Sequence, residues 1–226
     1  LTALGALLDH PAKPFVAVIG GAKISGKIDV LEHLLGLVDT FLIGGGMMFT
    51  LVKAQGGAIG RSLLEEDKLE TAAHFLRHAR EKDVRVLVAP DCRAAASPQG
   101  GETRVVASDR VPDDWLGVDI GPESEAQFRA EIVGARTVLW NGPMGIFEVP
   151  AFASGTLSVA RALADATKRG AHTVVGGGDS VAAVHEAGVA SHITHVSTGG
   201  GASLEFLEGK TLPGVQALDT RVQAVS

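Results

Sequence analysis

The residues that could do chemistry in this sequence stand directly after short apolar runs that end in glycine clusters. Lys23 follows Gly20 and Gly21, and Lys27 comes four residues later, a spacing that would put both lysines on one face of a helix. Two ammonium groups this close repel each other unless an anion lies between them. Glycine lets a ligand approach the backbone, and a helix that begins there directs free N–H groups at an anion. The pattern favours a phosphate-bearing ligand, although two solvated surface lysines are the alternative interpretation.

Asp179 and Ser180 follow a second glycine cluster, 176–178. A carboxylate here could anchor Mg²⁺, while Ser180 and the amides of Gly177 and Gly178 bind phosphate oxygens. The alternative is a simple helix N-cap, which is a common use of Asp and Ser. Both roles are compatible, because a capping carboxylate can also coordinate a metal through solvent.

Other polar residues give weaker signals. Glu148 follows the apolar run 137–141 and could accept hydrogen bonds from ribose hydroxyls, or it could simply be solvated. His74 and His78 are four residues apart, but we expect no glutamate or third ligand to converge on them, so the sequence predicts no zinc site. The chain has no G-x-S-x-G motif of a serine hydrolase.

The two common nucleotide-binding motifs are both incomplete. The run 21–28 has the P-loop spacing, but Ile28 stands where a Ser or Thr should hold magnesium. No glycine cluster completes G-x-G-x-x-G, because Phe49, Val181 and Leu204 occupy the third glycine position. A standard Walker motif is therefore not expected, and an NAD(H)-dependent domain stays a weakly supported alternative.

The elements that must position these residues alternate between strand and helix. Predicted strands are 15–19, 39–43, 84–89, 115–120, 137–141, 172–175 and 193–197. Predicted helices are 26–36, 46–55, 65–82, 123–133, 152–168, 179–187 and 201–208. The segments 91–96 and 103–107 are predicted to form a hairpin. Such alternation predicts an α/β fold with a parallel sheet, and ligands then bind at the carboxyl ends of the strands.

Composition excludes several classes of function. The net charge is −6 and no basic stripe is present, which argues against binding of nucleic acid. The one cysteine, Cys92, cannot form an intramolecular disulfide and is expected to be a small buried residue rather than a nucleophile. No apolar run is long enough to span a membrane and no signal pattern is present, so we expect a cytoplasmic protein without membrane partners.

An ordered series of motifs resembles the phosphoglycerate kinase family, from about Phe15 to Leu218. Its members are 20–23 with Lys27, 43–47, 115–122, 140–143, 176–180, 195–203 and 207–215. The resemblance covers the family's C-terminal half. It implies a Rossmann-like three-layer sandwich with a central parallel sheet at 13–210, part of an interdomain helix at 1–12 and a tail at 211–226. The helical spacing of Leu1–Leu8 agrees with that helix and suggests that the chain is part of something longer.

The resemblance also implies an activity and its partners. The reaction would be reversible phosphoryl transfer between 1,3-bisphosphoglycerate and ADP, giving 3-phosphoglycerate and ATP, with Mg²⁺. The N-terminal domain that binds the phosphoglycerate is absent from this chain, so the chain alone would bind the Mg-nucleotide without turnover. A monomer is expected. A non-catalytic binding module is the second alternative.

The resemblance assigns roles to individual residues. Lys27 would grip the nucleotide phosphates, Glu148 the ribose, and Asp179 the Mg²⁺. The residues at the transferring group would be Lys23, Gly178, Gly200 and Gly201. Phosphate would be bound by Gly177, Gly178 and Ser180. The adenine slot and its surroundings would involve Gly20, Gly21, Gly44, Gly45, Gly117, Asn141 and Pro143. The stretch 92–101 matches the family poorly and is expected to be a variable surface excursion.

Overall fold

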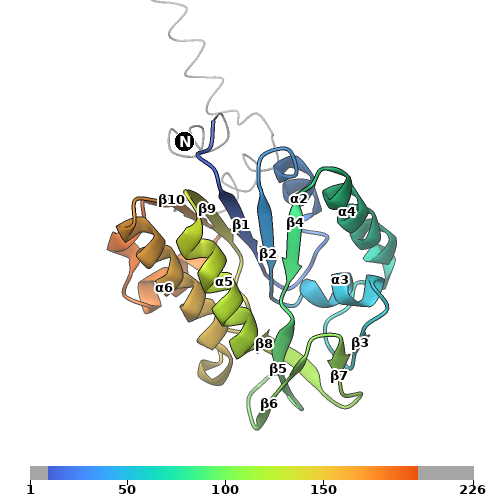
Figure 1. Ribbon diagram of the computed structural model, residues 1–226. Coiled ribbons are helices and arrows are strands. Elements are labelled where there is room, and N and C mark those ends of the chain that lie inside the picture. Colours follow the sequence, from blue (N-terminus) through green and yellow to red (C-terminus); the bar gives the residue numbers. More distant parts are fainter. Residues whose placement is uncertain (1–9, 198–226) are drawn as a thin grey trace, which may run out of the picture.

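The computed structural model describes residues 10–197, and a six-stranded parallel sheet forms its centre (Figure 1). The strand order is β11-β10-β9-β1-β2-β4, and every neighbouring pair is parallel. The strands are β1 (Phe15–Ile19), β2 (Thr40–Ile43), β4 (Arg85–Val88), β9 (Thr137–Asn141), β10 (His172–Gly176) and β11 (His195–Val196). All residues of β1 and β9 are buried, as expected where helices cover both faces of a sheet.

Helices cover both faces of the sheet and complete three layers. One layer contains α2 (Ile28–Leu34), α3 (Met48–Ala54) and α4 (Leu69–Glu81), and α5 (Pro122–Gly134) and α6 (Ser154–Lys168) lie on the opposite side (Figure 1). The helix α7 (Gly178–Glu186) packs against α6. Short 3₁₀ turns are η1 (Glu66–Lys68), η2 (Pro150–Phe152) and η3 (Ala190–His192). The expected α/β fold with a central parallel sheet is confirmed.

The strand order reverses between β1 and β9. The chain passes from β1 to β2 and β4 on one side, and from β9 to β10 and β11 on the other. In open α/β sheets the crevice at such a reversal is where ligands bind. Here the two strand ends are joined directly, because the Gly20 N–H donates to Asn141 O (2.9 Å) and the Gly21 N–H donates to Pro143 O (2.8 Å).

One predicted strand belongs to a different sheet. The run predicted at 115–120 forms β8 (Leu116–Ile120), which pairs antiparallel with β5 (Asp91–Ala95) outside the parallel sheet. The predicted hairpin is confirmed, since β5 pairs antiparallel with β6 (Thr103–Ala107). The expectation of one parallel sheet is therefore wrong for β8, because an apolar run specifies a strand but not its partner. Another short pair, β3 (Ala58–Ile59) with β7 (Arg110–Val111), is too short to show periodicity in the sequence.

The start of α2 also differs from the prediction. The helix begins at Ile28 rather than at residue 26, and Lys27 occupies its N-cap position. The preceding residues form a tight turn in which the Lys27 N–H donates to Ile24 O (2.8 Å). Because Lys23 and Lys27 both precede the helix, the expectation that they share a helix face is wrong. The predicted 65–82 helix is divided into η1 and α4.

Several expectations fall partly or wholly outside the described residues. These are the helices at 1–8 and 201–208, the tail at 211–226 and the division into 1–12, 13–210 and 211–226, which stays a prediction. Within residues 10–197, none of the helices is both long and apolar enough to cross a membrane.

The contact between β1 and the loop after β9 predicts a measurable dependence on glycine. Gly142 has φ +94°, and a Cβ there would stand 2.2 Å from Gly20 O. We expect Gly142→Ala to lower the free energy of unfolding by at least about 2 kcal/mol, because it combines backbone strain with a steric clash. Urea denaturation measures this change.

Gly36→Ala is the matched control, since a Cβ at Gly36 meets nothing within 4 Å and its φ is not in the left-handed region. Equal effects of the two substitutions would show that the close approach at Gly142 does not limit stability.

Candidate functional site

A cavity of about 720 Å³ lies at the carboxyl ends of the central strands. Its volume is in the range of small-molecule sites. Six residues predicted from the sequence line it, although they come from five separate segments of the chain: Gly21, Gly45, Gly117, Pro143, Glu148 and Asp179. The structure therefore brings together residues that are up to 158 positions apart in the chain.

One part of the cavity wall is apolar and was not foreseen. Its side chains include Met48, Phe49, Leu63, Leu64, Leu116, Val118, Met144 and Ile146. Leu63, one of two large apolar residues that are exposed among the described residues, lies in this wall and is 51% exposed. Phe49 fills the space beside Gly117, where a Cβ would stand 2.0 Å from its ring. No role was predicted for these residues, because their types are those of an ordinary core, although Leu116 and Val118 lie within the motif at 115–122.

The polar part of the site is organised around Lys27 and Asn141. The Lys27 side chain passes Gly21, and its Nζ donates a hydrogen bond to Asn141 Oδ1. Asn141 is fully buried, and among the described residues its Nδ2 has no hydrogen-bond partner. A buried donor left in this state costs about 1–3 kcal/mol. A ligand oxygen would relieve that cost, so Asn141 fits a role in binding.

The start of α7 faces the same cavity. Gly177 occupies the N-cap position with φ +89°, and its backbone lies close to the amide of Asn141. Asp179 is exposed in the first turn and makes no capping hydrogen bond, so the alternative of a simple N-cap is not what the structure shows. Ser180 is buried, and its Oγ accepts a hydrogen bond from the Gly142 N–H (2.7 Å). This bond fixes the first turn of α7, with its free N–H groups and partial positive charge, beside the end of β9.

The remaining predicted residues take different places. Lys23, Glu148 and Gly178 are exposed, and Lys23 directly follows Ala22, which lines the cavity. Gly20 and Gly44 are buried behind the wall, where a Cβ would clash with the loop after β9. Gly200 and Gly201 lie outside the described residues. The roles of all these residues stay predictions.

Asp119 is a buried carboxyl group at the floor of the cavity that the sequence did not reveal. Its oxygens accept hydrogen bonds from the N–H groups of Ile120 (2.9 Å) and Gly155 (2.8 Å), which ties β8 to the start of α6. Arg93 lies 3.6 Å away and is shared with Glu125 at 2.7 Å. Burial outweighs these favourable contacts and raises the pKa of Asp119 to about 7.

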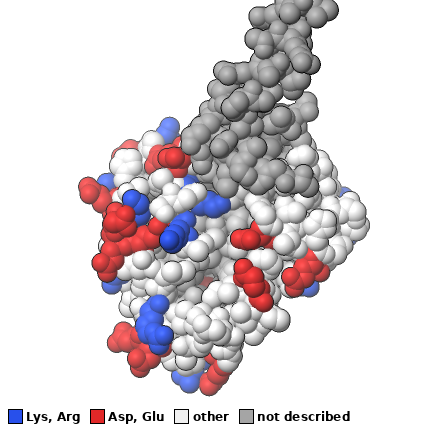
Figure 2. Space-filling view, turned by 180° about the vertical axis from the view of Figure 1, so that it is seen from behind, with Lys and Arg blue, Asp and Glu red and all other residues white. Residues whose placement is uncertain are grey.

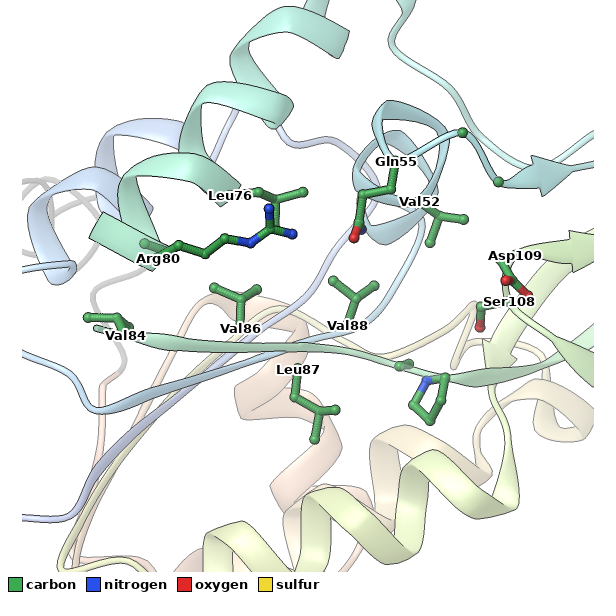
Figure 3. A pocket seen from close by; sticks show the side chains of 15 residues that line it. Val52, Gln55, Leu76, Arg80, Val84, Val86, Leu87, Val88, Ser108 and Asp109 are labelled. Atoms are coloured by element: carbon green, nitrogen blue, oxygen red, sulfur yellow. The ribbon is translucent and has the colours of Figure 1, made fainter. Parts of the chain in front are cut away.

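A second cavity is not a candidate for the predicted ligand site. It measures about 650 Å³ and lies between α3, α4 and β4, where Val86 and Val88 point towards α4 (Figure 3). Its lining combines aliphatic side chains with polar ones such as Arg80 and Asp109, and no residue predicted to bind a ligand contributes to it. Cys92 is fully buried, as expected, and burial raises the pKa of its thiol to about 12.

The surface charges are mixed on the face shown in Figure 2. Lys and Arg side chains of the described residues alternate there with Asp and Glu side chains and form no continuous basic stripe.

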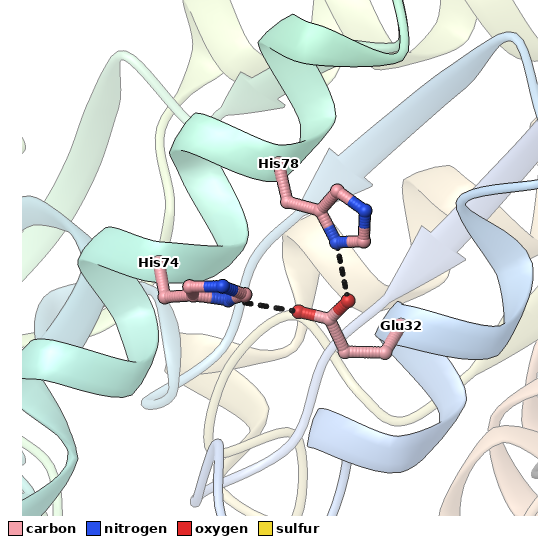
Figure 4. A group of neighbouring side chains, drawn as sticks. All are labelled: Glu32, His74 and His78. Atoms are coloured by element: carbon pink, nitrogen blue, oxygen red, sulfur yellow. Dashed lines mark hydrogen bonds and ion pairs between the residues drawn. The ribbon is translucent and has the colours of Figure 1, made fainter.

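The histidine pair on α4 has a partner that the sequence analysis excluded. Glu32 of α2 lies between His74 and His78, with its two carboxylate oxygens directed at the two rings (Figure 4). The expectation that no glutamate converges there is wrong. Glu32 is more than 40 residues away in the sequence, and only the packing of α2 beside α4 brings it near.

Comparisons with known proteins agree on one family. A sequence model described as phosphoglycerate kinase matches residues 1–210. Phosphoglycerate kinases from Chloroherpeton thalassium and Chlorobium limicola are 59% and 58% identical, each over 96% of this chain and 55% of the relative. The solved structure of the enzyme from Coxiella burnetii has a TM-score of 0.91 at 41% identity, covering 97% of this chain and 56% of that chain. The one from Pyrococcus horikoshii OT3 has a TM-score of 0.82 at 30% identity. The chain thus spans about half the length of the curated relatives it matches.

The buried carboxyl of Asp119 predicts how stability changes with pH. Its folded pKa of about 7 is above the ordinary 3.8, so the folded state keeps a proton that the unfolded chain releases. The resulting stabilisation is complete below about pH 4 and is lost as the pH rises to about 7. We expect the unfolding free energy to fall between pH 5 and pH 8 by on the order of 2 kcal/mol more in the unmodified chain than in Asp119→Asn.

Urea denaturation at pH 5 and at pH 8 gives the fall in unfolding free energy for each protein. Only this fall is compared between the two proteins, because the asparagine also changes the two hydrogen bonds and with them the stability at any pH. Identical pH dependence in the two proteins would contradict the raised pKa.

Proposed function

The chain belongs to the phosphoglycerate kinase family, and from this premise we propose that it forms the nucleotide-binding part of a phosphoglycerate kinase. The ligand would be Mg²⁺ with ADP or ATP, bound in the cavity at the carboxyl ends of the sheet. The observation that carries this proposal is the division of the site into two parts. One part is the apolar wall of the cavity, and the other is formed by Asp179 at the start of α7 together with the hydrogen-bonded pair Lys27 and Asn141, which lies beside the cavity wall at Gly21.

This division matches the chemistry of a nucleotide. A flat base suits the apolar slot between Gly45 and Gly117, and Glu148 at the cavity wall can accept hydrogen bonds from ribose hydroxyls. The phosphates would then lie by Lys27 and by the first N–H groups of α7, the part of the site with cationic and dipolar character. The unpartnered Nδ2 of Asn141 would donate to a phosphate or ribose oxygen.

The magnesium ion is proposed to be held by Asp179 together with the nucleotide phosphates. Mg²⁺ binds oxygen ligands, often through one carboxylate and the substrate, and Asp179 is an exposed carboxylate in the cavity wall. When bound, the ion would neutralise phosphate charge. Lys23 and Gly178, with Gly200 and Gly201, would stabilise the group in transfer through an ammonium group and backbone N–H groups.

The proposed reaction moves a phosphoryl group from the acyl phosphate of 1,3-bisphosphoglycerate to the terminal phosphate oxygen of ADP, giving 3-phosphoglycerate and ATP. The phosphoglycerate would be bound by a part of the protein that this chain does not contain, in agreement with its length relative to the family. The family resemblance further implies a cytoplasmic monomer acting in glycolysis.

Lys27 provides the sharpest test of nucleotide binding. We expect Lys27→Ala to weaken binding of MgADP by about 10- to 100-fold, because charge-assisted hydrogen bonds are worth about 1.5–3 kcal/mol. Isothermal titration calorimetry measures the dissociation constant, and circular dichroism checks that the variant is folded.

Lys82→Ala removes an exposed lysine next to the end of α4 and serves as the control. An unchanged affinity in a folded Lys27→Ala variant would contradict the assigned role. Tighter binding of NAD(H) than of MgADP by the unmodified chain would favour an oxidoreductase domain instead.

The incomplete length of the chain predicts binding without turnover. We expect the 226-residue chain to bind MgADP but to give no phosphoryl transfer above background in a coupled assay with 3-phosphoglycerate and MgATP. A full-length family member serves as the positive control. Substantial turnover by this chain would show that a complete site for both substrates is present.

A further inference from the structure

We propose that Glu32, His74 and His78 form a binding site for a divalent transition-metal ion such as Zn²⁺, separate from the nucleotide cavity. The three side chains offer one carboxylate oxygen and two imidazole nitrogens, and these ligand atoms all lie within 4.8 Å of one another. None of the three lines the nucleotide cavity.

The geometry is close to that of a coordinated ion. His78 Nδ1 lies 2.7 Å from Glu32 Oε2, and His74 Nδ1 lies 3.6 Å from Glu32 Oε1. Ligands about 2.0–2.1 Å from a tetrahedral zinc ion are separated by about 3.3 Å. One observed distance is shorter than this value and the other is longer, so the side chains would rotate to admit the ion.

The backbone holds the ligands in a favourable arrangement. His74 and His78 are one turn apart on α4, so both rings project from the same face and converge on Glu32 (Figure 4). The three residues come from two helices in the same layer, and each helix is held by its own packing against the sheet. Little ordering is therefore required when the ion binds.

The ligand types select the class of ion. Two histidines and a glutamate are a set that binds zinc with water at the fourth position. Imidazole nitrogen suits zinc, copper and nickel, whereas Mg²⁺ requires oxygen ligands. The site is therefore distinct in its chemistry from the proposed magnesium position at Asp179.

Solvent can reach the site. The side chain of His74 is 62% exposed, and those of His78 and Glu32 are 33% and 32% exposed. This leaves a path for the ion and room for water ligands. Cys92, the only thiol of the chain, is fully buried and does not compete for the metal.

Calorimetric titration of the 226-residue chain with ZnCl₂ in a buffer that does not chelate zinc tests the proposal. We expect one ion per chain and no displacement by a large excess of MgCl₂. Zinc at about 100 times its dissociation constant should raise the midpoint of thermal unfolding by roughly 5–10 °C.

The variants His74→Ala and Glu32→Gln should each weaken zinc binding at least 10-fold and reduce this thermal shift. His33→Ala removes an exposed histidine next to Glu32 that is not part of the cluster, and it should leave both values unchanged. Glu32→Gln keeps the shape of the side chain, so we expect this variant to fold, and circular dichroism checks that it does.

The outcomes separate cleanly. Loss of the one-to-one event in the cluster variants, but not in His33→Ala, supports the site. No binding to the unmodified chain, displacement by MgCl₂, or equal affinity in Glu32→Gln and the unmodified chain overturns it.

Discussion

The loop at 142–146 is the element on which the rest of the candidate site depends. Its backbone receives hydrogen bonds from the ends of two strands, since Gly21 N–H donates to Pro143 O and Gly45 N–H donates to Met144 O (3.0 Å). Its own N–H groups donate to Ser180 of α7, to Thr156 of α6 and to Val118 of β8. One short segment thus fixes the relative positions of three strands and two helices. Because most of these bonds are backbone to backbone or buried, the cavity wall is formed by folding itself rather than by a ligand.

In this arrangement the backbone and the core hold the cavity wall, and exposed side chains supply the charges. The apolar slot and the start of α7 are held by the core and by Ser180, so they are in place before a ligand arrives. The charged groups assigned to the nucleotide, in contrast, are largely exposed: Lys23, Glu148 and Asp179 all lie at the surface. Phosphoryl transfer depends on positioning and charge neutralisation more than on covalent chemistry. A wall held by backbone and core contacts, with exposed charged groups around it, is consistent with that requirement.

Sequence reasoning succeeded where local pattern determines structure. Buried parallel strands are continuous apolar runs, so β1, β2, β9 and β10 were found close to their observed bounds. The glycine clusters identified the strand ends that meet at the cavity, because a close backbone approach such as that of Gly142 to Gly20 admits no side chain. Sequence reasoning failed where the structure depends on contacts between residues that are distant in the chain. The pairing of β8 with β5, the exposed Leu63 at the cavity and the buried Asp119 follow from tertiary packing that no local pattern encodes.

The helix α2 connects the proposed transition-metal site with Lys27 of the proposed nucleotide site. It begins immediately after Lys27, and the Lys27 carbonyl oxygen accepts the hydrogen bond of the Leu31 N–H (2.9 Å). Glu32 is the next residue along the helix. An ion that joined Glu32 to α4 would restrain α2, and with it the backbone that carries Lys27 towards Asn141. The two proposed metal sites would differ in ligand chemistry, since the nitrogen ligands on α4 favour a transition metal and the carboxylate of Asp179 suits Mg²⁺. The helix has 7 residues, so a restraint at Glu32 would act on nearly its whole length.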